Sequence, residues 1–181
     1  MKITIFGMAG TGTSSTGKLL AERLGYPFVS GGDMGRLTAK ELGVSLNELE
    51  DLSKKDKKYD LLRDEHLKKF GMENEDAVIE ARLGWYSVPD SIKIKLTCPD
   101  DVRLKRIADR ENKDLAQVEA ETVHREKAIK ERFKEYYNMD FDRDTADDRF
   151  DLVLDTSLAD LEGIVLGIIN FLKVKGLEKE I

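Results

Sequence analysis

The chain has 181 residues, which is enough for one domain with a well-buried core. Its net charge of −6 argues against binding of nucleic acid through bulk charge, and no apolar run approaches the roughly 18 residues of a membrane-spanning helix. A strand expected directly after Met1 argues against a signal peptide, and the single Cys98, expected to be a buried thiol, cannot form an internal disulfide, so we expect a cytoplasmic protein.

The first predicted elements are a strand, a glycine-rich loop and a helix. Residues 3–6 form an apolar run, residues 7–15 are rich in glycine, and residues 16–24 have a helical pattern. This order favours a phosphate-binding loop, because glycine lets the backbone approach phosphate oxygens and the helix N-terminus offers unpaired N–H groups. The sequence therefore predicts a P-loop.

The expected phosphate contacts lie in this loop, although the usual lysine is absent. The pattern G-x-x-x-x-G-K-[ST] has its lysine where this chain has Thr13. Lys18 does not replace it, because five residues along a helix place it about 140° around and roughly 7–8 Å beyond Thr13. Ser14 is also the expected Mg²⁺ ligand. The residues expected to bind phosphate are Gly7, Gly10, Thr11, Gly12, Thr13, Ser14 and Ser15.

The rest of the chain alternates between strands and helices. Further strands are predicted at residues 27–29, 77–80, 92–97 and 151–155. Helices are predicted at residues 34–42, 45–52, 100–110, 114–137 and 157–174, and another runs from a charged joint at 54–58 to about residue 70. Their expected N-caps include Ser45, which forms a capping box with Glu48, and Asp100, Asp114 and Ser157. Strands separated by helices predict a parallel sheet with helices on both faces, which binds ligands at the carboxyl ends of its strands.

Eight segments of this sequence match the pattern of a known family. They are residues 7–25, 29–36, 79–85, 94–96, 103–111, 125–126, 132–137 and 150–157. Together they resemble the nucleoside monophosphate kinases, and most closely the cytidylate kinases of the archaeal type. The pair Tyr136-Tyr137, followed by the strand Asp-Leu-Val-Leu-Asp-Thr-Ser, separates this group from adenylate kinases. The chain departs from the pattern at Thr13 and at Gly35, where a large apolar residue is usual.

The resemblance implies a fold, an activity and partners. The fold is a single P-loop kinase domain over residues 1–181, of the α/β class: a three-layer fold with a five-stranded parallel sheet, a helical acceptor-binding insert at about 34–70 and a lid at about 111–137. The activity is Mg²⁺-dependent transfer of the γ-phosphoryl group of ATP to CMP or dCMP by a monomer. Two alternatives remain: a kinase for another nucleoside monophosphate or small acceptor, and a nucleotide-binding module without catalysis, since the P-loop lysine is absent.

Arginines supply the expected catalytic groups, because a planar guanidinium can bind two phosphate oxygens at once. The resemblance places Arg36 and Arg82 on the acceptor phosphate and Arg106 and Arg110 at the base of the lid, near ATP. The residues expected to be catalytic are Arg36, Arg82, Arg125 and Arg132. The charge of the missing lysine is expected from the lid cations Arg125, Lys127, Lys130 and Arg132.

Some side chains keep alternative interpretations. Asp33 either orients Arg36 or caps the following helix, and Tyr136 and Tyr137 either pack the lid or contact a base. Trp85 is expected to contribute to packing, and His66 and His124 are expected to lie at the surface. Asp60 and Arg63 are expected to lie on the helical insert over the acceptor base.

Overall fold

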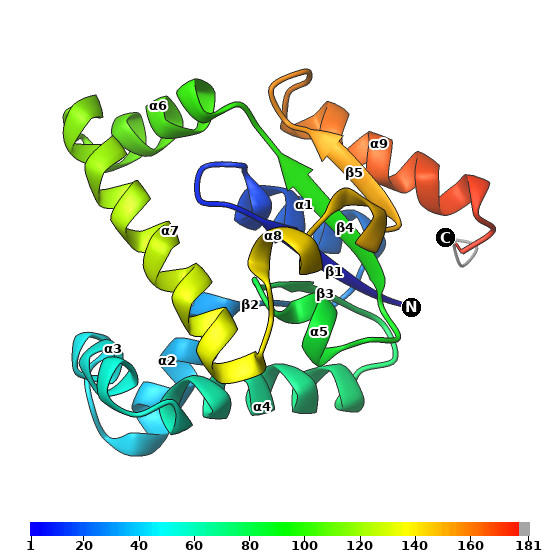
Figure 1. Ribbon diagram of the computed structural model, residues 1–181. Coiled ribbons are helices and arrows are strands. Elements are labelled where there is room, and N and C mark those ends of the chain that lie inside the picture. The colour runs from blue at the N-terminus through cyan, green and yellow to red at the C-terminus, as the bar shows by residue number, and fades with distance from the viewer. Residues whose placement is uncertain (178–181) are drawn as a thin grey trace.

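The structure, a computed structural model, describes residues 1–177, and these contain a five-stranded parallel sheet with helices on both faces (Figure 1). The strands are β1 (Lys2–Gly7), β2 (Phe28–Ser30), β3 (Ala77–Glu80), β4 (Ile92–Thr97) and β5 (Leu152–Asp155). Their order is β2-β3-β1-β4-β5, and every pair of neighbours is parallel. The predicted fold class is confirmed; residues 178–181 of the predicted domain lie outside the described part.

The described helices surround this sheet. They are α1 (Thr13–Leu24), α2 (Gly31–Leu42), α3 (Leu46–Lys55), α4 (Lys58–Glu73), α5 (Gly84–Ser87), α6 (Asp100–Glu111), α7 (Leu115–Tyr137), α8 (Phe141–Asp144) and α9 (Leu161–Val174), with a 3₁₀ turn at Asp147–Arg149. In Figure 1, α2, α3 and α4 form one group below the sheet, and the long α7 runs from α6 toward that group. Helices α5 and α8 were not predicted, because four residues are too few to show a helical period.

The central strand β1 is buried on both faces, which explains its continuous apolar run. Ile3 and Ile5 are fully buried in a cluster with side chains of α1 and α9. Phe6 points to the opposite face, as the two-residue period of a strand requires, and belongs to a cluster with Ile129 and Phe133 of α7. Helix α9 is the most apolar of the longer helices, yet no helix within residues 1–177 is long and apolar enough to cross a membrane.

The sheet topology places the glycine loop at a point where the connections diverge. From β1 the chain passes to β2 and β3 on one side, and then crosses to β4 on the other side of β1. Ligands of open parallel sheets bind in the crevice at the carboxyl ends of the strands at such a point. The loop after β1 and the residues that follow β3 therefore meet at the same edge.

Two predicted N-caps are confirmed by side-chain hydrogen bonds. Ser45 and Glu48 form the reciprocal capping box at the start of α3. The Asp114 carboxylate accepts hydrogen bonds from the backbone N–H groups of Ala116 and Gln117 at the start of α7. These caps satisfy donors that have no partner inside a helix.

Two other predicted N-caps are wrong. Asp100 is the first residue of α6 rather than its cap, and its carboxylate pairs with Arg103. Helix α9 begins later than expected, with Asp160 as its N-cap, whereas Ser157 donates a hydrogen bond to Asp155 within the preceding turn. A short polar side chain favours turns and caps alike, so the sequence did not distinguish the two positions.

Two side chains differ from their predicted environments. Cys98 is half-buried rather than buried, with Arg106 Nη1 3.5 Å from its Sγ. His66 is largely covered between α2 and α4, where Nδ1 lies 3.2 Å from Thr38 Oγ1 and Nε2 lies 3.0 Å from Glu41 Oε2. His124 is exposed, as expected.

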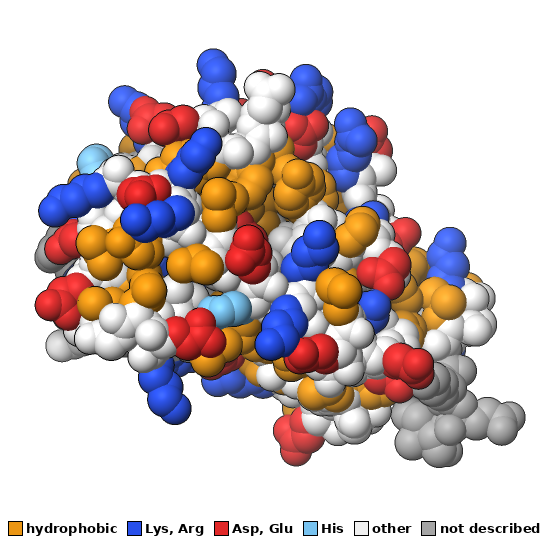
Figure 2. Space-filling model, turned by 90° about the horizontal axis from the view of Figure 1, so that it is seen from below, with side chains coloured by type: hydrophobic (Ala, Val, Ile, Leu, Met, Phe, Trp, Pro, Cys, Tyr) orange, Lys and Arg blue, Asp and Glu red, His pale blue; other side chains and the backbone are white. Residues whose placement is uncertain are grey.

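The face seen from below in Figure 2, on the side of α4 in Figure 1, carries acidic and basic side chains mixed with hydrophobic ones. Among the described residues on this face, the two signs of charge are interspersed rather than segregated. Nucleic acids are attracted by surfaces of concentrated positive charge. The described residues of this face show no such concentration of positive charge.

Replacing Gly10 by alanine is expected to destabilise the protein more than replacing Gly12. Both glycines have a positive φ, 84° and 86°, in which a side chain costs about 1–2 kcal/mol. A Cβ at Gly10 would also lie 2.5 Å from the Arg103 carbonyl oxygen, whereas one at Gly12 meets nothing within 4 Å. Urea unfolding should show an additional loss of about 1–3 kcal/mol for Gly10→Ala. Equal losses would show that the loop does not pack against α6 in this way.

Candidate active site

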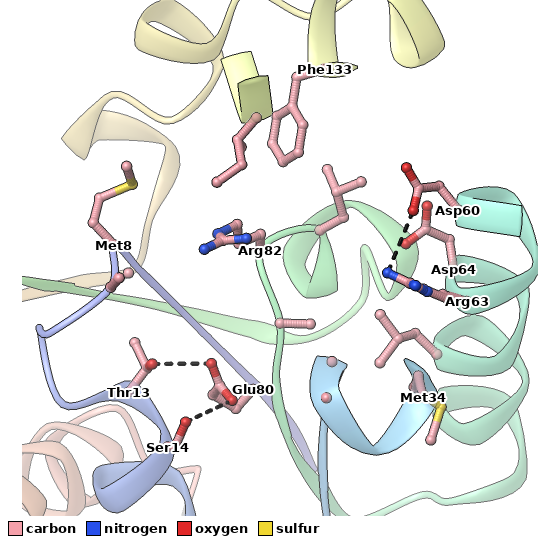
Figure 3. A pocket seen from close by; sticks show the side chains of 18 of the residues that line it. Met8, Thr13, Ser14, Met34, Asp60, Arg63, Asp64, Glu80, Arg82 and Phe133 are labelled. Atoms are coloured by element: carbon pink, nitrogen blue, oxygen red, sulfur yellow. Dashed lines mark hydrogen bonds and ion pairs between the residues drawn. The ribbon is translucent and has the colours of Figure 1, made fainter. Parts of the chain in front are cut away.

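A cavity of about 550 Å³ lies at the carboxyl edge of the sheet (Figure 3). The glycine loop and the start of α1 form one wall, the residues after β3 form its centre, and α4 and α7 form the opposite side. The glycine loop, α4 and α7 thus contribute to one cavity. Such a concave site at a sheet edge is the usual form of a small-molecule binding site.

The glycine loop presents unpaired backbone donors to this cavity. Gly12 is the N-cap of α1, and no side chain caps this helix. The first N–H groups of α1 have no partner within the helix, so they and the helix dipole favour an anion there. The loop itself is fixed by Thr11, whose buried hydroxyl donates a 2.7 Å hydrogen bond to the Met8 carbonyl oxygen.

Most of the predicted phosphate-binding residues meet at the cavity. Thr11 is the exception, since its hydroxyl is engaged inside the loop and it does not line the cavity. Lys18 is exposed and also outside the lining, as its position on the helix predicted. The predicted loop residues that line the cavity are Gly7, Gly10, Gly12, Thr13, Ser14 and Ser15.

Glu80 is hydrogen-bonded to Thr13, the residue at the position of the missing lysine, and to the neighbouring Ser14. Thr13 Oγ1 donates to Glu80 Oε1 at 3.0 Å, and Ser14 Oγ donates to Glu80 Oε2 at 3.1 Å (Figure 3). Glu80 was not among the predicted site residues, although its place at the end of β3 puts it at the ligand edge. Hydroxyl and carboxylate oxygens are the ligands that Mg²⁺ prefers, so this pair of side chains fits the predicted metal position at Ser14.

Arg82 lies in the middle of the cavity wall, two residues beyond Glu80 (Figure 3). Its side chain is half-buried, and no carboxylate within residues 1–177 forms an ion pair with its guanidinium. Burial, together with the positive charges of Arg132 and Arg125, lowers the pKa of Arg82 below its usual range. The charges of Glu80 and Glu126 act in the opposite direction, but neither carboxylate forms an ion pair with Arg82. A cation held beside other cations without a direct ion pair attracts anions.

The other predicted catalytic arginines differ in their access to the cavity. Arg132 lines it, and Nη1 donates a 3.3 Å hydrogen bond to Asp60 Oδ2. Arg125 is exposed and outside the lining, although it lies close enough to Arg82 to affect its pKa. Arg36 is also outside the lining, and its side chain is 62% exposed.

Asp33 performs both of the roles that the sequence left open. Its Oδ2 accepts hydrogen bonds from the backbone N–H and the hydroxyl of Ser30, which completes a capping box at the start of α2. Its Oδ1 accepts a 2.5 Å hydrogen bond from Arg36 Nη2. The carboxylate therefore fixes the beginning of α2 and the direction of Arg36 together.

Arg106 and Arg110, which the resemblance places near ATP, both line the cavity. Arg106 donates to the hydroxyl and the carbonyl oxygen of Thr156, at 2.9 and 2.8 Å, which connects α6 to the turn after β5. Arg110 donates to Glu111 at 3.0 Å.

The lysines of α7 do not face the cavity. Lys130 Nζ lies 2.7 Å from Asp142 Oδ1, and Lys127 is 76% exposed beside Glu131. Among the cations expected to replace the missing lysine, only Arg132 lines the cavity.

The end of the cavity farther from the loop is formed by α4 and the last turn of α7. Tyr136 donates to the Ser53 carbonyl oxygen at 3.4 Å, and Tyr137 donates to Asp64, so the two tyrosines join α7 to α3 and α4. Both also line the cavity. Trp85 packs against Phe150 and donates to the Arg82 carbonyl oxygen at 2.9 Å, which confirms its expected role in packing.

A glycine loop at a helix N-terminus, at the diverging point of a parallel sheet and facing an arginine-lined cavity, defines a P-loop protein of the kinase type. Solved structures share this fold: shikimate kinase from Aquifex aeolicus (TM-score 0.61, 19% identity, covering 99% of this chain and 100% of that chain) and an uncharacterised protein from Eubacterium ventriosum (TM-score 0.73, 18% identity, 96% and 98%).

Sequence similarity narrows this class further. The profile of the cytidylate kinase-like family matches residues 2–158. A cytidylate kinase of Archaeoglobus fulgidus is 35% identical over 176 residues, covering 97% of this chain and 96% of the relative. A cytidylate kinase of Haloarcula marismortui is 39% identical over 167 residues, covering 91% and 85%. The chain belongs to the cytidylate kinase-like family.

Proposed function

We propose that the protein transfers the γ-phosphoryl group of ATP to CMP or dCMP, giving ADP and CDP or dCDP. The observation that carries this proposal is a single cavity with a P-loop at one end, the insert helix α4 at the other, and Arg82 between them, in no ion pair with a carboxylate of residues 1–177. Relatives named cytidylate kinase, which cover most of this chain, support CMP as the acceptor. We expect the protein to act as a monomer on these small nucleotides.

The arrangement suits phosphoryl transfer, which needs in-line positioning and neutralisation of charge more than covalent help from the protein. The N–H groups at the start of α1 would bind the ATP phosphates, with Arg106 and Arg110 on the same side. Arg82 and Arg132 would contact the transferred group and the acceptor phosphate from the facing walls. These preorganised cations stabilise the charge that spreads over the phosphoryl oxygens in the transition state.

Ser14 and Glu80 would hold the Mg²⁺ ion. Their oxygens lie 3.1 Å apart at the start of α1, next to the expected position of the ATP phosphates. A bound Mg²⁺ ion neutralises phosphate charge and orients the phosphates. The two residues would also keep Thr13 in place through the second oxygen of Glu80.

A nucleotide-binding module without catalysis is the less favoured alternative. Such a module needs cations only where it holds its nucleotide. This cavity instead presents Arg82 midway between the glycine loop and α4, and Arg132 on the side of the insert, where it contacts Asp60 of α4. These groups have a use only if a second anionic substrate occupies that side.

The direct test is a panel of acceptors with ATP and Mg²⁺, followed by ADP release. CMP and dCMP are expected to have the highest kcat/KM among CMP, dCMP, UMP, AMP, GMP and shikimate, and omission of Mg²⁺ should abolish turnover. A higher kcat/KM for AMP, GMP or shikimate would overturn the proposed acceptor. ATP binding without turnover of any acceptor would instead favour the non-catalytic module.

A further inference from the structure

A half-buried carboxyl group on α4, that of Asp64, forms no ion pair within residues 1–177. Asp64 lines the cavity, and in Figure 3 its carboxylate points from α4 toward the side where Arg82 lies. One of its oxygens accepts a hydrogen bond from the Tyr137 hydroxyl. Within residues 1–177 its other oxygen has no hydrogen bond and no ion pair. The free oxygen is therefore available to a molecule in the cavity.

The neighbouring carboxylate, one helical turn away, has a different environment. Asp60 lies 3.3 Å from Arg132 Nη1 and 3.5 Å from Arg63 Nη1, so two guanidinium groups balance its charge. Asp64 forms no ion pair within residues 1–177, and its carboxylate accepts a hydrogen bond from the neutral phenol of Tyr137. Burial of a carboxylate without a cation is unfavourable unless a hydrogen-bond donor satisfies it.

We propose that Asp64 binds the exocyclic amino group of the acceptor base, so that it selects cytosine over uracil. This inference rests on the proposed function, since it assigns the base that the acceptor side of the cavity recognises. Cytosine presents an N4 amino donor where uracil presents the O4 acceptor, and carboxylates are natural partners of that amino group. Tyr137 holds one carboxylate oxygen and thereby directs the other. Uracil would place two acceptors opposite each other, which is unfavourable without water between them.

The surroundings of this carboxyl group fit a flat base. Met34 and Leu67 line the cavity next to Asp64 and belong to one buried apolar cluster. An apolar surface beside a single polar group is the usual composition of a selective small-molecule site, because the polar group fixes orientation. The phosphate of the same acceptor would point toward Arg82.

The protonation state of Asp64 gives a second readout. Burial raises the pKa of Asp64 to about 6, the Asp60 charge also raises it, and Tyr137 and Arg63 act in the opposite direction. These are the groups of α4 and α7 that face it. Above this pKa the carboxylate accepts from cytosine N4; below it, the acid can donate to uracil O4. Selectivity for CMP over UMP should therefore fall as the pH falls.

The test compares kcat/KM for CMP and UMP in the wild type and in Asp64→Asn. The amide can turn either its oxygen or its NH₂ group toward the base, so the CMP/UMP ratio is expected to fall about 10- to 100-fold, while KM for ATP stays unchanged. Both acceptors are measured on one preparation, so the ratio does not depend on the folded fraction. Asp60→Asn is the matched control, which should reduce both acceptors alike and preserve the ratio.

The pH dependence of the CMP/UMP ratio of kcat/KM is measured with the same two substrates between about pH 8 and about pH 5. The ratio should decline in the wild type and remain flat in Asp64→Asn; ionisation of the acceptor phosphate is common to both substrates and cancels. An unchanged ratio in Asp64→Asn would overturn this inference alone, provided that the wild type phosphorylates CMP. A wild type that does not phosphorylate CMP would overturn the proposed function and this inference together.

Discussion

Arg82→Ala is expected to lower kcat with CMP on the order of 10³-fold, the effect of losing an arginine that stabilises the transferred phosphoryl group. The residue lies between the glycine loop and α4, and no carboxylate within residues 1–177 forms an ion pair with it. Its guanidinium is thus free to contact phosphate oxygens from both substrates. Steady-state kinetics with saturating ATP and CMP measure the loss.

Arg36→Ala provides the matched control for this prediction. Arg36 was expected to share the acceptor phosphate, but it is largely exposed and held by Asp33. We expect its replacement to raise KM for CMP by less than about tenfold, the scale of one weakened charged hydrogen bond. Equal, small effects of both substitutions would show that Arg82 is not a catalytic group.

The melting temperature of Arg82→Ala tests the role of Arg82 independently of the kinetics. Because burial and the neighbouring Arg132 and Arg125 lower the pKa of Arg82, the folded protein holds this cation at a cost. Its removal should leave the melting temperature unchanged or raise it, while activity falls. This opposition between stability and activity is typical of a functional site. A clear loss of stability would indicate a structural role.

Arg132→Ala is expected to reduce kcat by on the order of 10²–10³-fold, because it removes the one cation of α7 that lines the cavity among those predicted. Its only described ion pair is the 3.3 Å contact with Asp60, so most of its donors remain available to phosphate. The measurement is kcat with CMP at saturating ATP.

Lys130→Ala is the control on the same helix. Lys130 was expected to supply charge to the phosphates, but its Nζ lies 2.7 Å from Asp142 Oδ1 and it does not line the cavity. Removal of this partly exposed pair should cost about 0–1 kcal/mol of stability and leave kcat unchanged. If Lys130→Ala and Arg132→Ala reduced kcat equally, the lid would have to adopt another orientation during the reaction.

The features that the sequence predicted well are those with local causes. The alternation at residues 92–97 predicted β4 with its observed bounds, and the Ser45 and Glu48 capping box marked the start of α3. The glycine loop could be predicted for the same reason, since strand, loop and helix are contiguous. Helix α2 begins at Gly31, before the predicted start at residue 34, because Ser30 and Asp33 form a second capping box there. The prediction did not include this capping box.

The features that the sequence could not predict depend on distant contacts. The hydrogen bond between Tyr137 and Asp64 joins residues 73 positions apart, and the bond between Thr13 and Glu80 joins residues 67 positions apart. Likewise, the direction of Lys130 is decided by Asp142 on α8, an element that has no periodic signal. Side-chain roles at the site followed from the arrangement of α4 and α7, which a sequence pattern does not contain.

We expect this chain to transfer phosphoryl groups to CMP although Thr13 stands in place of the P-loop lysine. The most direct measurement follows γ-labelled ATP with and without CMP in the presence of Mg²⁺ and separates the products. The label is expected in the β-phosphate of CDP, only when CMP is present, with little release as inorganic phosphate. Label that remains in ATP while nucleotide binding is intact, or that passes mainly to water, would contradict the claim.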